Sequence, residues 1–87
     1  MKCTLLGFKS VDFEDDNGNK ISGVKIYYSY PDVTDDDLVG DMTDGKFINQ
    51  KAFDSFPVTV KDLKENIGCA FDIEFNPNKK VVGLCLA

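Results

Sequence analysis

Gly23-Val-Lys-Ile-Tyr-Tyr-Ser-Tyr-Pro31 is the stretch that decides the fold of this chain. Side chains alternate with a period of two along a β-strand, so the stretch has two different faces. One face is apolar and aromatic and can build a core: Val24, Ile26, Tyr28 and Tyr30. The other face places Lys25 beside Tyr27, a pairing that can hold a phosphate and stack a base. A surface strand that uses aromatic residues only because they suit strands remains the plain alternative.

The residues before this stretch predict a β-hairpin. Lys2–Phe13 is rich in strand-forming residues, with Gly7 as a bend or bulge. Asn17-Gly18 follows, and this pair is the strongest short signal for a hairpin turn because both residues tolerate positive φ. The first strand therefore turns directly into a second strand at Ile21–Tyr30, which Pro31 ends.

The rest of the chain predicts a long loop, one short helix and a final hairpin. Asp32–Gly45 is acidic and rich in turn residues, and Lys46-Phe-Ile48 is a possible short third strand. Asn49 is a plausible N-cap for a helix at Asn49–Phe56, which Pro57 closes. The stretch after Pro57 is ambiguous, although Thr59 can cap a further helical turn through Leu63.

The last hairpin begins with a cleanly alternating strand at Cys69–Phe75. Asn76–Lys79 is the turn. Lys80–Ala87 is apolar on both faces and is expected to be at least partly sandwiched. The chain is long enough for one domain, residues 1–87. Its pattern of at most five strands and one short helix predicts a mainly β fold, a small closed or half-closed antiparallel barrel. An open antiparallel α+β sheet is the main alternative.

Composition excludes several kinds of active site. The chain has no histidine and no arginine, so nucleophilic triads and bidentate arginine clamps are excluded. Three dispersed cysteines, Cys3, Cys69 and Cys85, do not make a four-ligand zinc site. No apolar run reaches the ~18 residues of a membrane span. We expect a cytoplasmic, non-enzymatic protein with no metal, no cofactor and no membrane contact.

The acidic residues do not form a recognisable metal site. The chain carries a net charge of −5, and its acids concentrate in the first half. An EF-hand loop that starts at Asp15 fails, because Lys20 stands where the pattern needs glycine and Ile26 where it needs glutamate. Asp72 and Glu74 share a strand face, but nothing marks either one as a buried catalytic acid.

A lysine and aromatic set remains, and the order of the segments around it resembles a known family. The first hairpin, Phe13-Glu-Asp-Asp-Asn-Gly18, and the ending Ile67-Gly68 with Phe71-Asp-Ile-Glu-Phe-Asn-Pro-Asn-Lys-Lys-Val-Val82 resemble the small single-stranded DNA-binding proteins of bacteriophages and conjugative elements. The filamentous-phage DNA-binding proteins typify this family. The resemblance implies a five-stranded OB-like barrel with one short helix before the last hairpin. It also implies sequence-independent coating of single strands, usually as a dimer.

Two functions follow as hypotheses. The first is a non-enzymatic single-stranded DNA-binding protein, which the resemblance implies is a homodimer, with a lysine and aromatic groove at these positions: Lys9, Lys20, Lys25, Tyr27, Tyr30 and Lys46. The alternative is a protein-interaction module of a phage or mobile element, whose acidic loop 32–45 faces a basic partner.

Overall fold

The computed structural model describes all residues, 1–87, and shows one five-stranded antiparallel sheet with two short helices. The strands follow the order β3-β2-β1-β4-β5 across the sheet. The elements run along the chain as β1 (Lys2–Glu14), β2 (Lys20–Tyr30), β3 (Met42–Asn49), α1 (Gln50–Asp54), α2 (Val60–Glu65), β4 (Ala70–Phe75) and β5 (Val81–Leu86).

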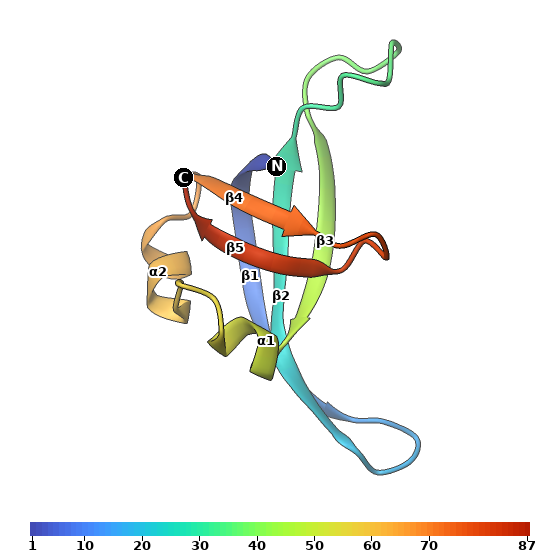
Figure 1. Cartoon of the computed structure of the whole chain (residues 1–87), viewed down its shortest axis with the longest axis vertical. Helices are drawn as coiled ribbons and strands as arrows, with labels where there is room; N and C mark the ends of the chain where they lie inside the picture. The colour runs from blue at the N-terminus through green and yellow to red at the C-terminus, as the bar shows by residue number, and fades with distance from the viewer.

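The sheet has two parts that enclose the core. β1, β2 and β3 form a long ribbon, and the β4–β5 hairpin crosses in front of it (Figure 1). The two parts are joined by a short ladder in which Lys2, Cys3 and Thr4 of β1 pair with β4. Because the sheet bends at this ladder, the apolar sides of the two parts face each other. Thirteen buried residues fill the space between them: Cys3, Leu5, Val24, Ile26, Tyr28, Ile48, Phe53, Val58, Leu63, Phe71, Ile73, Val81 and Leu84.

The alternation predicted for β2 is confirmed. Val24, Ile26 and Tyr28 are 1%, 0% and 1% exposed, whereas the residues between them are partly open to solvent. Burial of one such side chain is worth roughly 1.5–3 kcal/mol relative to its exposure. The single strand that carries these three residues therefore anchors the long part of the sheet.

The positions of the predicted turns and caps are also confirmed, although only Gly18 of the Asn17-Gly18 pair has a positive φ. Gly18 has a φ of 79° at the end of the first hairpin, where the Asp15 carboxylate accepts the backbone N–H groups of Asn17 and Asn19. The Asn49 side chain accepts the N–H of Ala52 at 2.8 Å and caps α1. Thr59 caps α2 in a capping box with Asp62.

The predicted mainly β antiparallel fold is confirmed, but the barrel is not, because the sheet is not closed and β3 and β5 are its two edges. Three other expectations from the sequence were wrong. There are two short helices rather than one, and β3 starts at Met42, so residues 42–45 belong to a strand and not to the acidic loop. β5 is not sandwiched, because Val82 and Leu86 of this strand are about half exposed.

Candidate nucleic-acid interface

The surface of the long ribbon that points away from the core carries the predicted pair of Lys25 and Tyr27. The register places Lys25 between Lys9 of β1 and Phe47 of β3, and it places Tyr27 between Gly7 and Gly45. Directly paired residues of antiparallel strands project to the same side of a sheet. We call this surface of β1–β3 the lysine–aromatic face.

Tyr27 lies between two glycines of the neighbouring strands, Gly7 of β1 and Gly45 of β3. A Cβ atom placed on Gly45 would lie 3.2 Å from Cδ1 of Tyr27 and 3.3 Å from Cε of Lys25, so both side chains lean over that glycine. A Cβ atom on Gly7 would meet nothing within 4 Å. The Lys25 ammonium lies 5.4 Å from the centroid of the Tyr27 ring, within the range of a cation–π contact. The two glycines thus leave the ring accessible from the side of β1.

Phe47 is held on the same face by a third glycine. A Cβ atom on Gly23 would lie 2.8 Å from Cζ of Phe47, so the phenyl ring covers the backbone at Gly23. Phe47 nevertheless stays 42% exposed. Farther along the first hairpin, Phe13 pairs with Ile21 on the same side and is 50% exposed. Three aromatic rings therefore follow one another along the face.

Acidic side chains of the ribbon project to the other side. By register, Asp12, Glu14 and Asp44 all share the side of the sheet that holds the core. The outward positions of β1–β3 include three lysines and no carboxylate: Lys2, Thr4, Gly7, Lys9, Val11, Phe13, Ile21, Gly23, Lys25, Tyr27, Ser29, Thr43, Gly45, Phe47 and Asn49. Lys2 is paired with Asp72 of β4, so the acid-free part is centred on Lys9 and Lys25.

The six residues predicted from the sequence do not form one groove. Lys9, Lys25 and Tyr27 come together on the lysine–aromatic face. Lys20 lies toward the end of the first hairpin, on the core side of the ribbon. It lines a separate shallow pocket with Lys51.

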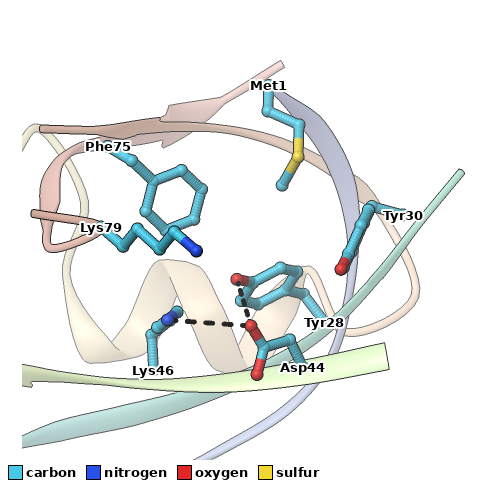
Figure 2. Close-up of a pocket in the computed structure, with 7 residues that line it drawn as sticks. All are labelled: Met1, Tyr28, Tyr30, Asp44, Lys46, Phe75 and Lys79. Atoms are coloured by element: carbon cyan, nitrogen blue, oxygen red, sulfur yellow. Dashed lines mark hydrogen bonds and ion pairs between the residues drawn. The ribbon is translucent and has the colours of Figure 1, made fainter. Parts of the chain in front are cut away.

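Tyr30 and Lys46 lie on the core side of the ribbon and line a pocket of about 360 Å³, which we call the tyrosine–lysine pocket. Figure 2 shows its seven lining residues: Met1, Tyr28, Tyr30, Asp44, Lys46, Phe75 and Lys79. The Tyr28 hydroxyl donates to Asp44 Oδ2 at 3.5 Å, and Lys46 Nζ lies 3.8 Å from the same oxygen. Burial, with the Asp44 charge as a smaller contribution, raises the pKa of Tyr28.

Four residues of the lysine–aromatic face and of the tyrosine–lysine pocket are not among the six positions predicted from the sequence: Phe13, Phe47, Phe75 and Lys79. Counting outward from a two-residue turn at Asn17-Gly18 would pair Phe13 with Ser22, whereas the loop of residues 15–19 pairs it with Ile21, so the face of Phe13 could not have been found by counting from the turn. Phe47 reaches its place only through the pairing of β2 with β3, and Phe75 and Lys79 only through the packing of the last hairpin across the ribbon. No local pattern in the chain specifies these long-range contacts.

No cluster of three or more metal-ligating side chains is present, and all three cysteines are free. No helix is both long enough and apolar enough to cross a membrane.

Comparison of the chain with protein families, with curated proteins and with solved structures found no match.

Proposed function

We propose that the chain is a non-enzymatic protein that binds single-stranded nucleic acid on the lysine–aromatic face. The observation that carries the proposal is the segregation of charge by strand register. In a chain with fifteen acids and ten lysines, the outward positions of β1–β3 hold lysines, aromatic rings and no carboxylate. This combination is the one that binds single strands without reading their sequence.

On this face, the aromatic rings and the lysines have different roles in binding. Tyr27, Phe47 and Phe13 are the platforms on which bases stack, and each stacked base is worth roughly 1–3 kcal/mol. Lys9 and Lys25 are direct partners on neighbouring strands, roughly 5 Å apart in backbone spacing, and neutralise the phosphates that pass between the rings. Arginine is absent from the chain, which agrees with backbone binding rather than bidentate recognition of a base.

The experiment is a fluorescence titration of a labelled thymidine oligonucleotide with the full chain at about 50 mM salt, where non-specific binding is stronger than at physiological salt. We expect Tyr27→Ala to weaken binding by about 1–3 kcal/mol, the value of one stacked base. Lys25→Gln should also weaken it. Lys61→Gln is the matched control, because it changes the charge by the same amount at a residue of α2 whose side chain is 80% exposed.

Two results would contradict the proposal. One is no binding at tens of micromolar protein, which is roughly the range of non-specific affinity. The other is equal loss of affinity in Lys25→Gln and Lys61→Gln, because binding would then follow the total charge of the protein and not the face.

The acidic loop supports a second candidate function, the docking of a basic protein partner. Residues 31–41 carry five aspartates and no lysine, and the loop extends away from the end of β2 and β3 (Figure 1). Val33 and Val39 on this loop are 90% and 97% exposed. The carboxylates of the loop would attract a basic partner surface, and the two exposed valines would contact apolar side chains on it.

A further inference from the structure

We propose that the tyrosine–lysine pocket is a second binding site, on the side of the ribbon opposite the lysine–aromatic face, and that it takes a nucleoside monophosphate. The pocket lies between the core side of β2–β3 and the turn that joins β4 to β5. Its volume of about 360 Å³ is within the range of small-molecule sites. This proposal is independent of the function proposed above.

The walls of the pocket suit an aromatic ring. Phe75 and Met1 approach from the β4–β5 side and from the N-terminus, and Tyr28 and Tyr30 approach from β2 (Figure 2). The two tyrosine rings are 5.9 Å apart between centroids and inclined by 41°. Tyr30, Phe75 and Met1 offer aromatic and thioether surface on which a flat ring can stack, and the Tyr28 ring, only 1% exposed, lies behind them as the floor of the hollow.

The charged groups in the pocket leave an excess of positive charge. Lys46 and Lys79 both direct their ammonium groups into the hollow in Figure 2, and Asp44 is the one carboxylate of the lining. Lys46 lies 3.8 Å from Asp44, whereas Lys79 has no ion-pair partner. A ligand with one anionic group would therefore be attracted, and Lys79 is free to bind it.

The backbone of Lys79 gives independent support. Lys79 has a φ of 62° and is the one residue other than glycine with a positive φ in the chain. Asparagine and glycine adopt this conformation at lower cost than lysine. Such positions concentrate at functional sites, and here the conformation belongs to the turn that presents the ammonium to the pocket.

The polar groups favour a nucleobase over a simple phenyl ring. Asp44 can accept the N–H groups of a base, and the Tyr30 hydroxyl can donate to or accept from its edge. A phosphate on the same molecule would reach the lysine ammonium groups. A nucleoside monophosphate contains all three features: a stacking ring, N–H donors and one phosphate.

The test is an NMR and calorimetric titration of the full chain with adenosine 5′-monophosphate. We expect the resonances of Tyr30, Lys46, Phe75 and Lys79 to shift and those of Lys9 and Lys25 to stay. Adenosine and inorganic phosphate, titrated separately, should each bind at least about tenfold more weakly, because each lacks one half of the contacts.

Lys79→Asn removes the ammonium and keeps a residue that tolerates positive φ, so the turn should survive. We expect it to weaken binding of adenosine 5′-monophosphate by about tenfold, the usual effect of losing a hydrogen bond to a charged group. Lys80→Asn is the matched control, since it changes the charge equally at the next residue, which does not line the pocket.

Three results would overturn the proposal: no binding of adenosine 5′-monophosphate at millimolar concentration, shifts confined to the lysine–aromatic face, or equal losses in Lys79→Asn and Lys80→Asn. The first and third results do not bear on oligonucleotide binding by the lysine–aromatic face, whereas the second would place the mononucleotide on that face and not in the pocket.

Discussion

Gly23 shows how a single residue shapes the lysine–aromatic face. An added methyl group there would overlap the Ile48 carbonyl oxygen and lie 2.8 Å from Cζ of Phe47. We expect Gly23→Ala to destabilise the fold by about 1–3 kcal/mol, the usual cost of overpacking, because the Ile48 backbone cannot move without breaking the β2–β3 ladder. Urea unfolding followed by circular dichroism measures the change.

Gly7→Ala is the matched control for that substitution. Gly7 also lies within a strand, but an added methyl group there meets nothing within 4 Å. The control should be neutral or stabilising by about 0.4–1 kcal/mol, because it only restricts the unfolded chain. Equal destabilisation by the two substitutions would show that strand glycines matter for flexibility and not for the close approach of β2 and β3.

Tyr28 predicts how stability depends on pH. Its pKa in the folded protein lies above the ordinary value of 10.0, first because of burial and then because of the nearby Asp44 carboxylate. The unfolded chain therefore loses the phenol proton at lower pH than the folded chain does, and stability should fall as pH rises above about 10.

The comparison with Tyr28→Phe isolates the effect of this one phenol from that of every other group in the protein. The variant has no phenol to ionise, so its stability should fall less steeply between about pH 10 and 11. The measurement is the urea midpoint at a series of pH values. Parallel curves for the two proteins would mean that the Tyr28 hydroxyl is not shielded from water.

For single residues, the sequence alone predicts which side of β2 each side chain occupies. Alternation separates Tyr27 from Tyr28 without any knowledge of partners, and the structure agrees. What surrounds each side chain is not predictable in the same way. The glycines on both sides of Tyr27 belong to β1 and β3, and only the register brings them together.

Among the elements, α2 is the one most dependent on its cap. It has six residues, too few for a stable isolated helix, and its first turn is held by two reciprocal hydrogen bonds. Asp62 N–H donates to Thr59 Oγ1 at 3.2 Å, and Thr59 N–H donates to Asp62 Oδ2 at 2.9 Å. We expect Thr59→Ala to lower the free energy of unfolding by about 1 kcal/mol.

Thr59→Ser keeps the hydroxyl and is the control, with an expected change well below that of the alanine variant. Urea unfolding measures both. Oligonucleotide binding should be the same in both, because α2 contributes no residue to the lysine–aromatic face. A loss of binding in Thr59→Ala alone would mean that the helix supports the face indirectly.

Helices, strands and turns are predictable from the sequence where the local signals agree. They are less predictable where pairing with a neighbouring strand overrides the local preference of the residues. Asn17-Gly18, Asn49 and Thr59 give correct turns and caps because the physics of each is local. The start of β3 at Met42 is different, since Asp44 and Gly45 are poor strand formers. They join the sheet because β2 is long enough to pair with them up to Tyr30.

For the whole molecule, closure of the sheet is the feature that sequence patterns do not determine. A barrel needs strand number, tilt and stagger to be mutually consistent. Here β1 and β2 have thirteen and eleven residues, whereas β4 and β5 have six each. The short hairpin crosses the ribbon without hydrogen-bonding to β3, and the gap that remains is where the tyrosine–lysine pocket lies.

The distribution of charge over the whole molecule leads to the last prediction. Tyr30 and Met42 are direct partners, so an Asn-Gly turn can replace residues 31–41. This change removes five carboxylates and brings the net charge from −5 to zero. Lys25 is five residues from Tyr30, about 16 Å at ~3.3 Å per residue, which exceeds the Debye length of ~10 Å at 0.1 M salt.

We therefore expect the loop replacement to leave oligonucleotide affinity at 0.1 M salt within about twofold and to leave its salt dependence unchanged. Lys25→Gln should instead reduce the slope of log affinity against log salt by about 0.7, the loss of one neutralised phosphate. Titrations at several salt concentrations measure both, and the same loop variant should lose any binding of a lysine-rich peptide. If the loop replacement tightened oligonucleotide binding tenfold, total charge rather than the local lysines would control the interaction, and the charge segregation on the ribbon would not explain binding.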